Sequence, residues 1–130
     1  MIVLDASVVV ELVLGTVAGR ALAERLAEPT LELHAPHLVD VEVTQVVRRY
    51  VLAGAVPAVR AELALSHLES LDLVRHEHGP LIPRVWALRH NLTAYDAAYV
   101  ALAEALDATL LTGDRRLAGA SGHTARVEVV

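Results

Sequence analysis

The chain has 130 residues, of which 55% are hydrophobic, and its formal net charge is −5. This length suits one domain that buries roughly two thirds of the surface of its unfolded chain, and no apolar stretch approaches the ~20 residues of a membrane-spanning helix. Cysteine is absent, which excludes disulfides and thiolate zinc sites. The negative charge argues against a protein that binds nucleic acid through its overall charge.

The first half of the chain alternates short apolar runs with helical segments. Residues 2–4 form an apolar run typical of a buried strand, and a helix is expected to follow as far as Leu14, where Gly15 ends it. Because Met1 leads directly into this strand, we expect no signal peptide, a cytoplasmic protein and no membrane association. The other elements expected here are a helix over 18–28, a strand over 32–35, a helix over 38–52 and a helix from Pro57 to about Leu71.

The second half continues the alternation. The elements expected are a strand over 73–75, helices over 82–89 and 94–106, a strand over 109–111, a short helix from Asp114 and a strand over 125–129. Short apolar strands that alternate with helices predict an α/β fold, a three-layer α/β/α sandwich with a central, mainly parallel sheet. The helices over 38–52 and from Pro57 should form a hairpin. Most of its apolar residues are expected in the core, and part of them in a dimer face or a groove for a partner helix.

Four acidic residues lie at the margins of these apolar elements. Asp5 follows the first strand and Asp114 follows the strand over 109–111. Ligands of parallel sheets bind at the carboxyl ends of strands, which is where both acids are expected. Glu42 lies on the margin of the apolar stripe of its helix, and Asp96 begins a helix that is apolar on nearly all sides. Since acids are rarely buried without a partner, a divalent metal ion is the partner we expect.

Helix capping is the alternative explanation for three of these acids. Asp5 and Asp114 each precede a predicted helix, where Asp is a favoured N-cap residue. Thr93 and Asp96 have the spacing of a capping box. A capping acid can also be a metal ligand, so both interpretations stay open. Glu42 has no such alternative. Oxygen ligands of this kind suit Mg²⁺ or Mn²⁺, which hydrolyse phosphodiesters by neutralising charge and activating water.

Four segments of the chain resemble the PIN-domain ribonucleases, specifically the VapC toxins of VapBC toxin–antitoxin systems. They are IVLDAS over 2–7, DVEV over 40–43, LTAYDAAY over 92–99 and LLTGDRRL over 110–117. They occur in the order and at the intervals of the family, and the resemblance covers nearly the whole chain. It implies one PIN domain over residues 1–130, with a Rossmann-like fold.

The resemblance also implies the roles of individual residues. Asp5 and Asp96 are the principal ligands of Mg²⁺, or of Mn²⁺, and Glu42 and Asp114 complete an acidic quartet. The family positions of Ser7 and Thr112 carry hydroxyls that support the site. The implied activity is metal-dependent endonucleolytic cleavage of RNA by the toxin, and the implied partners are a VapB-type antitoxin and a second copy of the chain. One departure is Gln45, where relatives often have Asn.

Basic side chains near the acids are candidates for RNA binding. Arg49 lies on the Glu42 side of its helix, and we expect it to contact RNA together with Arg115. Arg48 and Arg116 are more readily explained as charge on a helix face. Glu11 is expected to be surface charge unless its helix leads it along the acidic pocket.

Two further patterns are expected to be structural. Tyr95 and Tyr99 flank Asp96, where packing explains them better than stacking on a base. The sequence His76-Glu77-His78 resembles a zinc-ligand pair but lacks the further ligands that a zinc site requires.

Other functions fit the sequence less well. A phosphatase of the haloacid dehalogenase type requires a second Asp two residues after the first, where this chain has Ser7, and it requires a Lys, which this chain lacks. A response-regulator receiver fails for want of the same Lys. The alternative that stays open is a catalytically weak, PIN-like interaction module that regulates a partner.

Overall fold

The computed structural model describes residues 1–130 and contains five strands, seven α-helices and one short 3-10 helix. In chain order the elements are β1 (Ile2–Leu4), α1 (Ala6–Leu14), α2 (Val17–Arg25), β2 (Leu33–Pro36), α3 (Leu38–Leu52), α4 (Ala58–Ser70), β3 (Val74–His76), η1 (Gly79–Leu81), α5 (Ile82–Ala87), α6 (Ala94–Leu106), β4 (Thr109–Thr112), α7 (Arg115–Gly119) and β5 (Arg126–Val129).

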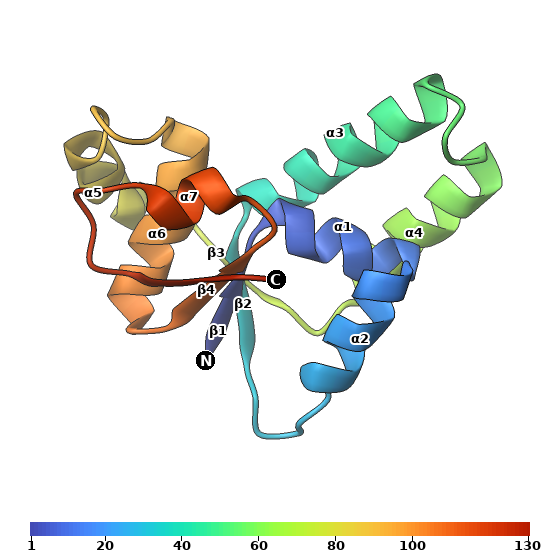
Figure 1. The fold of residues 1–130 in the computed structure, drawn as a ribbon, viewed down its shortest axis with the longest axis horizontal. Helices are drawn as coiled ribbons and strands as arrows, with labels where there is room; N and C mark the ends of the chain where they lie inside the picture. The colour runs from blue at the N-terminus through green and yellow to red at the C-terminus, as the bar shows by residue number, and fades with distance from the viewer.

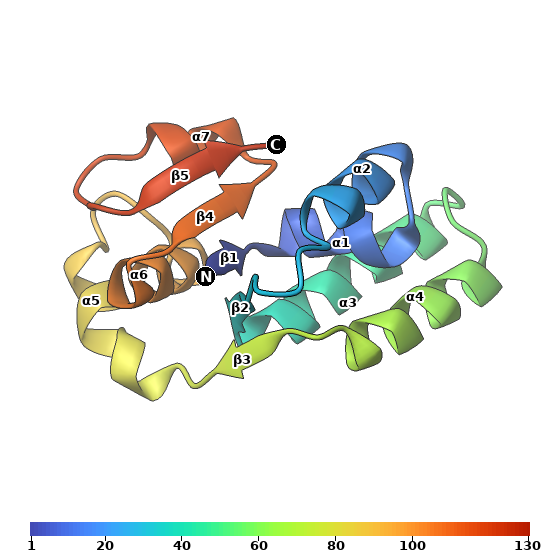
Figure 2. The ribbon, with the colours of Figure 1, turned by 90° about the horizontal axis from the view of Figure 1, so that it is seen from below.

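The five strands form one sheet in the order β3-β2-β1-β4-β5, and all four pairings are parallel. From β1 the chain proceeds to β2 and β3 in one direction and then returns to β4 and β5 on the other side of β1. Because crossovers between parallel strands are right-handed, this reversal places α1–α4 on one face of the sheet and α5–α7 on the other. Figures 1 and 2 show the two groups of helices on opposite sides of the strands. The three-layer α/β/α prediction is therefore confirmed, and the sheet is entirely parallel.

The central strands β1 and β4 each contain two consecutive aliphatic residues that are fully buried. Val3, Leu4, Leu110 and Leu111 have no exposed surface. Strands that are covered on both faces are continuously apolar because each side of the pleat meets a layer of helices. This explains why short apolar runs, without alternation, marked these strands in the sequence.

A sharp change of direction separates the first two helices. Gly15 ends α1 with φ at 62°, a left-handed conformation that favours glycine. The axes of α1 and α2 are bent by 103°. At Gly19 a Cβ atom would lie 1.8 Å from the carbonyl oxygen of Glu11, so only glycine permits this approach of the two helices. No single helix is long and apolar enough to cross a membrane, and only this bent pair passes that test by length and composition.

All the predicted elements are present, and several of their boundaries differ by one to three residues. Helix α2 ends at Arg25 rather than residue 28, α5 ends at Ala87 rather than residue 89, and β2 is shifted by one residue. Pro57 is the N-cap of α4 rather than its first residue. Strand β3 is shifted by one residue, since Val74 pairs with His34. The single turn η1 was not predicted because so short a helix shows no periodicity.

Candidate active site

Two of the four predicted acids lie between β1 and β4, where the order in which the chain adds strands to the sheet reverses. Asp5 directly follows β1 and Asp114 lies two residues beyond the end of β4, and these strands are neighbours in the sheet. In open parallel sheets, a crevice forms at this position because the connections from the two strands leave toward opposite faces. The fold thus brings together residues that are 109 positions apart in the sequence.

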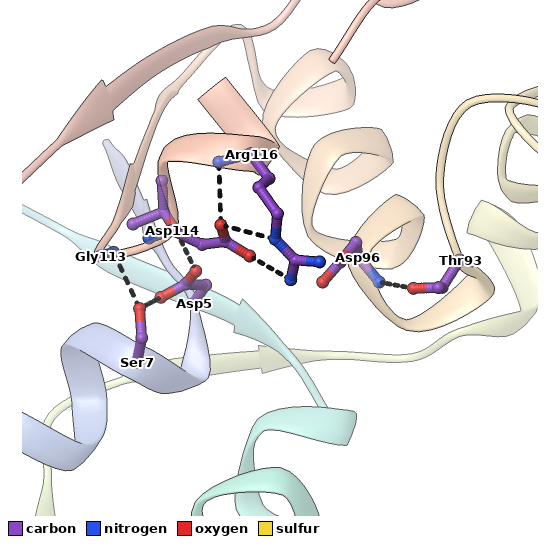
Figure 3. A network of polar contacts seen from close by, with 8 residues as sticks. Asp5, Ser7, Thr93, Asp96, Gly113, Asp114 and Arg116 are labelled. Carbon is purple, nitrogen blue, oxygen red and sulfur yellow. Dashed lines mark hydrogen bonds and ion pairs between the residues drawn. The ribbon is translucent and has the colours of Figure 1, made fainter. Parts of the chain in front are cut away.

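Asp5 is held by several hydrogen bonds. Ser7 Oγ donates to its Oδ1 at 2.5 Å, Thr112 Oγ1 donates to its Oδ2, and the Val8 N–H donates to Oδ1 at 3.2 Å as the N-cap bond of α1. Ser7 Oγ in turn accepts from the Gly113 N–H at 2.8 Å (Figure 3). Asp5 is 7% exposed and Thr112 is fully buried. The carboxylate is therefore both a helix cap and a rigidly oriented group at the bottom of the crevice.

Asp114 is also a helix cap, and it pairs with an arginine. Its Oδ1 accepts from the Arg116 N–H at 2.9 Å, and its Oδ2 lies 3.1 Å from Arg116 Nη2. These contacts lower the pKa of Asp114, chiefly through the Arg116 side chain. Figure 3 shows the guanidinium of Arg116 between Asp114 and Asp96. Arg116 is thus a counter-ion that belongs to the site itself.

Asp96 lies in the first turn of α6. The Asp96 N–H donates to Thr93 Oγ1 at 3.2 Å, so Thr93 is the N-cap as its spacing predicted. Burial is the main factor that raises the pKa of the Asp96 carboxyl, and the charge of Asp114 adds to it. Both effects disfavour the ionised carboxylate, and a cation bound nearby would favour it.

Glu42 reaches the same region from α3, which lies on the other face of the sheet from α6 (Figure 1). Its Oε1 accepts a hydrogen bond of 2.7 Å from the hydroxyl of Tyr99, which belongs to α6. Burial raises the pKa of Glu42, the Tyr99 hydrogen bond opposes this shift, and the charges of Asp96 and Asp5 add to it. Glu42 and Asp96 are therefore within electrostatic range of each other.

The four acids line one hollow of about 460 Å³, which we call the acidic hollow. Its charged and polar lining consists of Asp5, Ser7, Glu11, Glu42, Arg49, Tyr50, Asp96, Tyr99, Asp114 and Arg116. Five of these are carboxylates and only two are cationic. The hollow is accordingly negative, as a site that receives a metal ion must be.

The donor set of the acidic hollow fits a hard divalent cation. Carboxylate and hydroxyl oxygens are the ligands that Mg²⁺ and Mn²⁺ prefer, and Mg²⁺ needs only one or two direct carboxylates because it retains several waters. Burial is the main cause of the raised pKa values of Glu42 and Asp96, and the charges of neighbouring carboxylates add to it. A bound cation would favour the ionised form of both. No group of three or more His, Cys, Asp or Glu side chains has the arrangement of a complete metal site.

Of the two arginines predicted to contact RNA, one lines the acidic hollow and the other lies outside it. Arg49 lines the acidic hollow, as its helical position indicated. Arg116 lines it as well, whereas Arg115 is exposed and is not part of the lining. The sequence gives no means of choosing between adjacent arginines, because the turn at Asp114 decides which side chain faces the acids. Glu11 also lines the hollow, although surface charge was the favoured interpretation.

The histidines near β3 have structural partners. His76 Nε2 and His34 Nδ1 are 2.9 Å apart, and His78 Nε2 accepts from the Leu38 N–H at 2.9 Å. The second bond caps α3, whose N-cap residue makes no side-chain bond of its own. These contacts agree with the structural interpretation of the histidine pair.

The sequence is similar to one family model and to two curated relatives, and the fold is similar to a solved structure. Residues 2–122 match the family model of the PIN domain. Ribonuclease VapC1 of Mycobacterium tuberculosis is 44% identical over 129 residues, which cover 98% of this chain and 96% of that protein. Ribonuclease VapC12 of the same organism is 43% identical over 130 residues, which cover 100% and 99%. The crystal structure of VapBC2 from Rickettsia felis, bound to a DNA fragment from their promoter, matches the fold with a TM-score of 0.72 at 16% identity, over 100% of this chain and 99% of that one.

Proposed function

The chain belongs to the PIN-domain family and, within it, to the VapC ribonucleases, and from this premise we propose that it is a toxin that cleaves RNA endonucleolytically with the help of Mg²⁺. The observation that carries the proposal is the convergence of Asp5, Glu42, Asp96 and Asp114 on one hollow. Four elements of the fold supply these acids, so their meeting has no explanation in the capping of any one helix.

Asp5 and Asp96 would hold the metal ion, directly or through water, and Glu42 and Asp114 would bind through water or hold a second ion. When bound, Mg²⁺ or Mn²⁺ supplies charge neutralisation at the phosphate and lowers the pKa of water. Ser7 and Thr112 fix both oxygens of Asp5, which keeps the carboxylate oriented without a contribution from solvent. Such fixed orientation avoids reorganisation during the reaction.

The reaction we propose is in-line attack of water on phosphorus, which breaks the bond to the 3′ oxygen and leaves 5′-phosphate and 3′-hydroxyl ends. Glu42 and Asp114 are the carboxylates placed to orient the attacking water. Arg49 and Arg116, which line the hollow, are placed to bind the phosphates of the RNA strand. Arg115, which is exposed outside the hollow, stays a further candidate for RNA contact.

Replacing Asp5 by Asn tests the proposal. Asn is also a favoured N-cap residue, so Asp5→Asn should retain the fold while losing cleavage of a single-stranded RNA in the presence of Mg²⁺. Asp72→Asn is the matched control, because Asp72 is exposed and makes no hydrogen bond through its side chain. Unchanged cleavage by a cleanly purified Asp5→Asn protein would contradict the mechanism. Absence of cleavage by the wild type, with either Mg²⁺ or Mn²⁺, would favour the interaction module instead.

We also propose that a VapB-type antitoxin and a second copy of the chain are partners of this protein, and that it acts in the cytoplasm, where its RNA substrate lies. The α3–α4 hairpin supports partner binding, because Leu52, Val59 and Leu63 are more than half exposed there. Val59 and Leu63 are four positions apart on α4 and so share a face. Light scattering of the wild type and of Leu63→Glu, alone and with the antitoxin, tests both partners. Unchanged assembly in Leu63→Glu would exclude this face.

A further inference from the structure

Tyr99 has a contact that packing alone does not explain. Its side chain is 2% exposed, within α6. Its hydroxyl donates to Glu42 Oε1 at 2.7 Å, and this is the hydrogen bond that satisfies the buried group. The sequence predicted packing for this residue, which its burial agrees with, but gave no reason to connect it with Glu42, 57 positions earlier.

Both residues of this contact line the acidic hollow. Tyr99 follows Asp96 by three positions, so both side chains leave the same face of α6. Glu42 comes from α3 across the sheet, and the Tyr99 hydroxyl therefore joins the two helix layers beside Asp96. Glu42 Oε1 is occupied by this bond, whereas Oε2 accepts no hydrogen bond from the protein.

The Tyr99 hydrogen bond restrains a carboxylate that neighbouring negative charges repel. Glu42 shares the hollow with Asp5 and Asp96, which both repel its carboxylate. A glutamate side chain has three rotatable bonds, and a half-buried one could turn toward solvent to escape this repulsion. The Tyr99 hydroxyl is held by the packing of α6 and so defines one position for the carboxylate.

We propose that Tyr99 is a positioning residue, which holds Glu42 through Oε1 so that Oε2 is presented to the metal ion or to its bound water. This inference rests on the proposed function and deepens it, since it assigns the orientation of one member of the quartet. Tyr99 itself touches neither the metal nor the RNA. The loss of a group that orients a metal-binding side chain commonly lowers metal affinity or activity by about 10- to 100-fold.

Tyr99→Phe is the test, because it removes the hydroxyl and retains the ring. We expect its affinity for Mn²⁺, measured by calorimetry without RNA, or its cleavage rate at saturating Mg²⁺, to fall by about 10- to 100-fold. Tyr95→Phe is the matched control: Tyr95 lies one turn earlier on α6, is 63% exposed and makes no hydrogen bond through its hydroxyl. It should behave as the wild type in both measurements.

A double-mutant comparison shows whether Tyr99 acts through Glu42. In a Glu42→Gln background, Tyr99→Phe should cause little further loss, because the group that it positions is already gone. Glu42→Asp, whose shorter side chain cannot reach the hydroxyl, should reproduce the loss, and it serves if Tyr99→Phe fails to fold. Wild-type metal affinity and rate in Tyr99→Phe, or an equal loss in both backgrounds, would overturn the inference. A wild type that binds no Mn²⁺ and cleaves no RNA would instead overturn the proposed function.

Discussion

Thr112→Val should destabilise the protein because two hydrogen bonds beside the acidic hollow are lost, and not because packing in the core changes. Thr112 is fully buried and its hydroxyl donates to Asp5 Oδ2. Thr112 Oγ1 also accepts a hydrogen bond of 2.9 Å from the Asp114 N–H. Valine has nearly the same shape but makes neither bond. A hydrogen bond to a charged group contributes about 1.5–3 kcal/mol and a neutral one about 1 kcal/mol, so the free energy of unfolding should fall by about 2–4 kcal/mol.

Urea denaturation of the wild type and Thr112→Val in EDTA measures this difference directly, and thermal unfolding should show a midpoint lower by roughly 10 °C. Thr44→Val is the control. Thr44 is exposed, and its hydroxyl donates to the Asp40 carbonyl within α3 at 2.7 Å. Its loss should change stability by less than about 0.5 kcal/mol. If Thr112→Val were as stable as Thr44→Val, the hydroxyl would not be restraining Asp5.

Two further predictions concern the charge of the acidic hollow. Mg²⁺ at 100 times its dissociation constant should stabilise the wild type by about 2.7 kcal/mol, and Asp96→Asn should lose most of that gain. Thermal unfolding with and without Mg²⁺ measures the difference, and equal shifts of the midpoint in both proteins would exclude Asp96 as a ligand. The pKa of Glu42 is raised above 4.5 in the folded protein, mainly by burial, so its ionised form costs stability once the pH exceeds the raised pKa, and the cost is absent below the unfolded value. In EDTA, Glu42→Gln should therefore be more stable than the wild type at neutral pH and equal to it near pH 4, as urea denaturation across that range can measure; a constant difference would contradict this reasoning.

The fold was predictable because its elements have clear local signals. The apolar runs at β1 and β4 are bounded by an acid and by Gly113, and α3 and α6 have the residue ranges that their periodicity predicted. The predicted end of α2 was wrong, and Pro29 does not account for it: a proline restricts only the residue before it, Glu28, and the helix ends three residues earlier. The η1 turn depends on how β3 joins α5, which is a matter of tertiary packing.

The candidate site was predictable in its carboxylates and less so in what surrounds them. Asp5 and Asp114 follow from the rule for strand ends, and Glu42 from its position beside an apolar stripe. The bond from Tyr99 to Glu42 joins two helices on opposite layers, and no spacing in the sequence encodes such a pair. Whether Arg115 or Arg116 lines the hollow depends on a single turn of backbone.

The order of the strands has a consequence for the newly made chain. Asp114 and Thr112 belong to the last sixth of the sequence, yet they complete the surroundings of Asp5, near its beginning. Strand β4 must insert beside β1 before these groups meet. Asp5 and Glu42 are therefore made well before Thr112 and Asp114, and the centre stays incomplete in the meantime. If the protein cleaves RNA as we propose, the messenger being translated is not exposed to that activity before β4 has been made and has inserted beside β1.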